Sequence, residues 1–204
     1  MRAVVTIQGS ANLNNDNQAE ADERAAAYHE AGHCVAAYRL RIPFTGRKAL
    51  TIIPTETYSG RFVHNSILAD LDLNTSDHSR LRMERTAKVL LAGIESQRQY
   101  DETSITYGEG FGNWDGGTDY HSVVEIVDKF TSGPKESELY IELLRLRAQN
   151  LVHLGFNWKC ICAIADALMQ KKVLSAKEAI AIIQGTIKNI VGLVPFNRPP
   201  ATSA

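Results

Sequence analysis

The chain has 204 residues, with 22 basic and 23 acidic side chains and a formal net charge of −1 at pH 7. The charges are intermixed, which argues against a nucleic-acid-binding protein, and the apolar stretches are too short to cross a bilayer. Three cysteines, an odd number, predict reduced thiols rather than a disulfide framework. We therefore expect one soluble, cytoplasmic domain without a membrane segment.

Residues 1–17 contain a possible short strand over 3–7 and then become polar, so we interpret them as a flexible lead-in. An alanine-rich run over 19–40 follows, and its composition predicts a helix. A polar residue among 15–17 could cap the start of this helix, and Pro43 forbids its continuation.

This helix carries the sequence Tyr-His-Glu-Ala-Gly-His, which is an HExxH motif. His29 and His33 are four residues apart, so on a helix their imidazoles lie on one face, one turn apart. This spacing suits two ligands of one Zn²⁺ ion, and Glu30 could serve as general base. Gly32 costs about 1 kcal/mol against alanine in a helix interior, which is reasonable if another backbone or the substrate approaches closely. The competing interpretation is a structural helix with two ordinary histidines.

Two short runs, 48–54 and 59–64, have the β-branched and alternating patterns of strands and predict a hairpin. Pro54 cannot donate to a ladder of hydrogen bonds, so we place it at a free edge or a strand end. A helix is expected to start near residue 77 and to run to about residue 100.

Five of the eleven residues in 107–117 are glycine, which predicts a loop. A new helix follows, with Asp119 in its first turn, where a carboxylate is favoured in any case. A catalytic zinc ion normally has three protein ligands. The metzincin arrangement would need a third histidine at position 39, which is Arg39. Asp119 is the best candidate for the third ligand, because a rigid helix start can aim its side chain, and Asp115 and His121 are its rivals.

The rest of the chain is predicted to be helical, with Gly155 and Gly185 ending helices and Asn157 capping one. Ser175 and Glu178 match a capping box. The predicted domains are a lead-in, a core and a tail, over 1–17, 18–186 and 187–204. The predicted fold class is mainly α (α+β): a helical, zincin-like domain with a small hairpin beside the zinc-site helix.

Several segments resemble the peptidase domain of the FtsH-type ATP-dependent zinc proteases. The HExxH helix looks like that family's zinc-site helix, and the run Gly-Gly-Thr-Asp-Tyr over 116–120 matches the motif whose aspartate is the family's third ligand. The similarity extends, in the same order along the chain, over roughly residues 20–185. Other matching segments are 51–54 with 60–62, 89–93 and 163–175.

The resemblance implies a zinc-dependent metalloendopeptidase with His29, His33 and Asp119 as zinc ligands and Glu30 as general base. The family's ATPase module and membrane anchor have no counterpart here, and Gln97 stands where the family usually carries a glutamate. The family's ring is built largely with its ATPase part, so the resemblance predicts no hexamer. We expect cleavage of unfolded or flexible polypeptides, with a separate ATPase or unfoldase as a possible partner. The alternative is a zinc-binding, catalytically weak or inactive module with an interaction or regulatory role.

Overall fold

A computed structural model describes residues 10–55, 59–63, 77–102 and 117–192. Within these ranges the chain forms six helices and a small three-stranded sheet, which confirms the predicted mainly α class with a small sheet. The possible strand over 3–7 and most of the glycine-rich segment lie outside the described residues. The helices are α1 (Ser10–Leu40), α2 (Asp77–Tyr100), α3 (Gly117–Val127), α4 (Pro134–His153), α5 (Gly155–Lys171) and α6 (Ala176–Gly192), and the strands are β1 (Leu50–Thr51), β2 (Arg61–Phe62) and β3 (Val173–Leu174).

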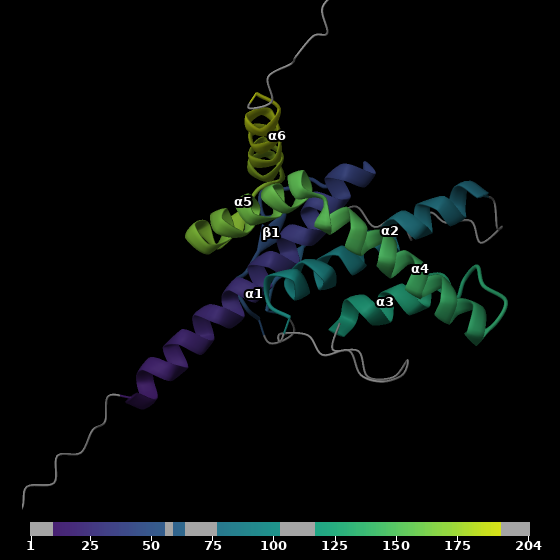
Figure 1. The fold of residues 1–204 in the computed structure, drawn as a ribbon, viewed down its shortest axis with the longest axis horizontal. Coiled ribbons are helices and arrows are strands. Elements are labelled where there is room, and N and C mark those ends of the chain that lie inside the picture. Colours follow the sequence, from purple (N-terminus) through teal and green to yellow (C-terminus); the bar gives the residue numbers. More distant parts are fainter. Residues whose placement is uncertain (1–9, 56–58, 64–76, 103–116, 193–204) are drawn as a thin grey trace, which may run out of the picture.

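Helix α1 is the central element, and it packs against both α2 and α5. It begins at Ser10, so residues 10–17, which we expected to belong to the lead-in, are helical. Its N-terminal part extends away from the other helices (Figure 1), and residues 18–22 are exposed. Its C-terminal half is rich in fully buried alanines, whose small side chains allow neighbouring helices to approach closely.

The buried residues form two apolar clusters, and α2 contributes to both. One cluster joins α1 to the sheet, α5 and α6, and includes Val35, Leu50 and Ile164. The other joins α2 to α3 and α4, and includes Leu91 and Val123. Helix α2 therefore lies between the two cores, because Val89 and Ala92 belong to the first cluster and Leu91 to the second.

The predicted hairpin is present but short. Strand β1 pairs antiparallel with β2, with Leu50 opposite Phe62, and also with β3, with Leu50 opposite Leu174. The strand order is β2-β1-β3, so β1 is the central strand and the expectation of a free edge marked by Pro54 was wrong. Pro54 instead follows the end of β1, where its missing N–H removes no ladder bond. Strand β3 was not predicted.

The C-terminal helices follow the predicted order with different ends. Leu154 caps the end of α4, so Gly155 begins α5 instead of closing α4 as expected. Asn157 lies inside α5, where its buried amide donates to the Leu151 carbonyl at 2.7 Å. The capping box is confirmed: the Ser175 N–H donates to the Glu178 carboxylate at 2.9 Å, and the Glu178 N–H donates to Ser175 Oγ at 3.2 Å. Helix α6 continues past Gly185, where we expected it to end, to Gly192.

Among the described residues, no single helix is long and apolar enough to span a membrane. The α4–α5 pair reaches the required length and apolarity only when both helices are counted together, and it is bent by 78°.

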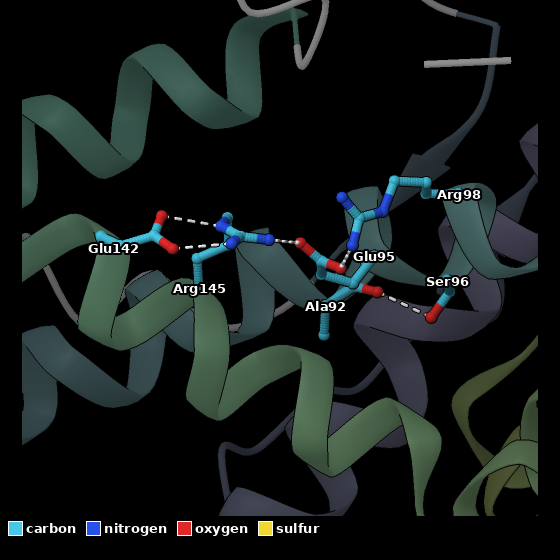
Figure 2. Close-up of polar contacts among 6 residues, drawn as sticks. All are labelled: Ala92, Glu95, Ser96, Arg98, Glu142 and Arg145. Carbon is cyan, nitrogen blue, oxygen red and sulfur yellow. Dashed lines mark hydrogen bonds and ion pairs between the residues drawn. The ribbon is translucent and has the colours of Figure 1, made fainter. Parts of the chain in front are cut away.

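A buried carboxylate links α2 to α4 (Figure 2). The side chain of Glu95, only 1% exposed, accepts a hydrogen bond from Arg98 at 2.9 Å and one from Arg145 of α4 at 3.4 Å. The guanidinium groups of Arg98 and Arg145 compensate the negative charge of Glu95, whose burial would otherwise be strongly unfavourable. Successive residues of an α-helix project about 100° apart, so positions 93 and 97, each two residues from Glu95, project from the opposite side of α2. Because Glu95 points towards α4, positions 93 and 97 point towards α1.

Candidate metal centre

His29, His33 and Asp119 meet where α1 passes the start of α3. The Oδ2 atom of Asp119 lies 2.8 Å from His29 Nε2 and 2.9 Å from His33 Nε2. One potential ligand atom from each residue lies within 4.8 Å of the other two. Asp119 is in the first turn of α3, as the sequence predicted. The structure therefore brings together the three predicted ligands, although His29 and Asp119 are 90 residues apart in the sequence.

Helix α2 orients the imidazoles of His29 and His33 through contacts with their Nδ1 atoms. The Nδ1–H of His33 donates to the Val89 carbonyl at 2.8 Å, and His29 Nδ1 lies 3.0 Å from the amide oxygen of Gln97. An amide oxygen can only accept, so His29 Nδ1 carries a proton in this bond. These bonds leave both Nε2 atoms directed at Asp119. Such an outer hydrogen bond is the usual way in which proteins fix the tautomer and ring orientation of a metal-binding histidine.

The charges within this cluster are strongly coupled. Burial opposes protonation of His33, but the Asp119 carboxylate outweighs this effect and raises the pKa of His33 to about 9. Burial would raise the pKa of Asp119, yet His33 and His29 hold that pKa well below its usual range. The carboxylate of Asp119 is therefore anionic across the physiological range, which makes it a competent ligand for a cation.

Glu30 is buried beside the three residues, with 5% of its surface exposed. Burial raises the pKa of its carboxyl group, although the charges of His33 and His29 partly lower it. Among the residues that the structure describes, none donates a hydrogen bond to its Oε2 atom. An unsatisfied buried carboxylate oxygen is costly, which makes Glu30 a candidate for a group that acts on a bound molecule.

Two glycines make room for the motif side chains, and a third allows α2 to approach α1 closely. A Cβ atom at Gly93 of α2 would lie 2.3 Å from His33 Cε1, and one at Gly60 would lie 2.7 Å from Glu30 Oε1. A Cβ atom at Gly32 would lie 2.3 Å from Ser96 Oγ and 2.5 Å from the Ala92 carbonyl oxygen, which confirms that another backbone approaches α1 at this glycine. Helix α1, which carries the HExxH motif, and α2 are thus in direct contact through small residues.

We expect Gly93→Ala to weaken the binding of any metal ion at this site, because the added methyl group collides with the His33 imidazole. Overpacking of this kind costs about 1–3 kcal/mol of stability. Gly185→Ala is the matched control, since Gly185 also lies in a helix but nothing would contact its Cβ within 4 Å, and it should stabilise the protein by about 0.5–1 kcal/mol. Zinc titration and denaturant unfolding of both variants test this. Wild-type zinc affinity in Gly93→Ala would contradict the assigned position of His33.

The rival ligands do not join this cluster in the described residues. His121 follows Asp119 on α3, but its side chain is 77% exposed and lies 3.4 Å from Glu125. Asp115 lies outside the described residues. The Val89 carbonyl, which has no side-chain signature, and the space at Gly93 were not predicted from the sequence. Gln97 was distinguished only as a departure from a family pattern, and its position against His29 was not predicted.

The donor set fits a zinc ion. Two imidazoles and one carboxylate are typical protein ligands of catalytic zinc, and three ligands leave one position for water or substrate. The outer hydrogen bonds to His29 and His33 are those that zinc-binding histidines usually make. A group of exposed acidic residues would not by itself indicate a metal site. His33, however, is buried, and both of its ring nitrogens have a partner: the Val89 carbonyl at Nδ1 and the Asp119 carboxylate at Nε2.

Neither a scan against protein-family models nor a search of curated proteins finds a match for this chain. The resemblance to FtsH-type peptidases therefore stays a prediction.

Proposed function

We propose that this protein is a zinc-dependent metalloendopeptidase. The proposal is supported by one observation above the others: the His29, His33 and Asp119 donors converge, and the carboxylate of Glu30 is buried next to them with an unsatisfied oxygen. A structural helix with two ordinary histidines would require neither the convergence of Asp119 nor an unsatisfied buried carboxylate. His29, His33 and Asp119 would hold the metal.

A bound zinc ion would lower the pKa of its water towards about 7 and polarise the carbonyl group of the peptide bond. Glu30 would accept at its carboxylate the proton that the attacking water loses. It would then return this proton to the amine nitrogen of the leaving peptide. The raised pKa of Glu30 suits this role, because a carboxyl group that holds a proton more tightly is a stronger base.

The experiment that tests the proposal measures metal content and hydrolysis on the full chain. We expect the purified protein to contain about one zinc per chain when saturated. It should cleave an unfolded, fluorescently labelled polypeptide, lose activity with a chelator and regain it with zinc. Zinc binding without cleavage would contradict the peptidase and favour the interaction or regulatory module. Absence of zinc binding would contradict both.

We predict that the protein alone cleaves unfolded or flexible polypeptides and spares tightly folded domains, with no effect of ATP. Opening a folded substrate locally costs several kcal/mol, and a hydrolytic site by itself supplies no work against that cost. Digestion of a stable domain and of its destabilised mutant, followed by mass spectrometry, measures the difference. Equal cleavage of both, with no other protein present, would be contrary to this prediction. Cleavage of the stable domain only after addition of a separate unfoldase would support it.

A further inference from the structure

Helix α4 carries a stripe of exposed leucines on the face that points away from the core. Leu139, Leu143 and Leu146 are 61%, 40% and 43% exposed. Their spacing of four and then three residues places them on one line along the helix. The opposite face of α4 is buried in the cluster with α2 and α3. We call these three leucines, with Asn150, the α4 stripe.

The α4 stripe has the spacing of a two-stranded coiled coil. Leu139 and Leu146 occupy d positions of a heptad, and Leu143 and the exposed Asn150 occupy a positions. In a parallel pair of helices an a residue packs against the same residue of the second copy. Asn150 would therefore face Asn150, an arrangement that specifies both two strands and their register. In an antiparallel pair centred on the leucines, Asn150 would instead face Leu139, which leaves a polar amide against an apolar side chain.

Charges beside the α4 stripe agree with the same arrangement. Glu142 occupies the g position, and Arg147 occupies the e position of the following heptad, five residues later. These two positions face each other across a parallel coiled coil, so each copy would offer a carboxylate to a guanidinium group of the other. Both side chains are about half exposed although each has a contact within its own chain. Figure 2 shows Glu142 held by Arg145, which is itself fixed to the buried Glu95.

We propose that the α4 stripe is an interface at which a second copy of this chain binds, with the two α4 helices parallel and in register. The observations that carry this inference are the self-complementary heptad positions and the complementary pair Glu142 and Arg147. The candidate metal centre is built from α1, α2 and α3, so association through the outer face of α4 does not depend on the proposed peptidase activity.

Sedimentation equilibrium of the full chain over a range of concentrations tests this interface. We expect a reversible dimer, and we expect Leu143→Glu to raise its dissociation constant by about 100-fold or more, because it places two carboxylates in one apolar layer. Val191→Glu is the matched control: Val191 is a 65% exposed apolar residue on α6, and its variant should dimerise like the wild type. Circular dichroism verifies that both variants fold. A chain that stays monomeric at all concentrations, or a dimer that Leu143→Glu leaves unchanged, would overturn the proposal.

The orientation has its own test. Under mild oxidation Leu143→Cys should form a disulfide-linked dimer. The wild type, in which Cys34 and Cys160 are buried and Cys162 is partly exposed, gives the background of cross-linking through the native cysteines. The charge reversal Glu142→Arg should weaken the dimer, and the double variant with Arg147→Glu should restore at least part of the affinity. A dimer that shows neither the cross-link nor this rescue would contradict the parallel register.

Discussion

Replacing Glu30 with glutamine is expected to leave zinc binding intact and to abolish peptide hydrolysis. The amide of glutamine has nearly the shape of the carboxylate but cannot take a proton from water. Loss of a general base typically lowers the rate by about 100- to 10,000-fold. Because Glu30 is buried with one unsatisfied oxygen, a neutral side chain of the same size should not lower stability.

The ligand variants His29→Ala and His33→Ala are the counterparts of this experiment. Each removes one of the three donors that converge on the site, so both should lose most of the bound zinc. Metal analysis and peptide cleavage on the three variants, with thermal unfolding as a check on the fold, separate the two roles. Equal zinc loss in Glu30→Gln, or undiminished cleavage by it, would exclude the assignment of Glu30 as base.

Helix α2 shows how far local sequence determines this fold. Its start at Asp77 and its end at Tyr100 match the prediction, because a periodic apolar pattern and good helix formers continue through the whole segment. Helix α1 shows the limit of the same reasoning. Its polar first residues resemble a cap and a lead-in, yet they continue the helix from Ser10. Local propensity alone does not distinguish a cap from one more helical turn.

The candidate site, like the fold, could be predicted only in part from the local sequence. The spacing of His29 and His33 follows from helical geometry, and these residues could be predicted as a pair. Their outer partners could not, since the Val89 carbonyl and the position of Gln97 depend on how α2 packs on α1. The sheet was only half predictable, because β3 is two residues long and pairs with a strand more than 100 residues earlier in the chain. Such contacts are set by the tertiary fold rather than by a local pattern.

Asp119 is the residue whose role depends most on the tertiary structure, and its replacement is the second variant with a large expected effect. Asp119→Asn should weaken zinc binding and abolish hydrolysis. The anionic oxygen that lies 2.8 Å from His29 Nε2 and 2.9 Å from His33 Nε2 becomes part of a neutral amide, which is a much poorer ligand for a cation. The loss of a protein ligand should lower zinc affinity by at least about 100-fold.

The controls for Asp119→Asn come from the same stretch of chain. His121→Ala removes an exposed imidazole two residues further along α3, and it should leave the metal in place because this side chain points towards Glu125. Asp115→Asn tests the remaining rival, which lies outside the described residues. Competition with a chromogenic zinc chelator gives the affinity of each variant, and cleavage of the unfolded substrate gives its activity. If Asp115→Asn or His121→Ala loses zinc while Asp119→Asn retains it, the third ligand is not Asp119, and the contacts of Asp119 with the two histidines serve only to hold α3 against α1.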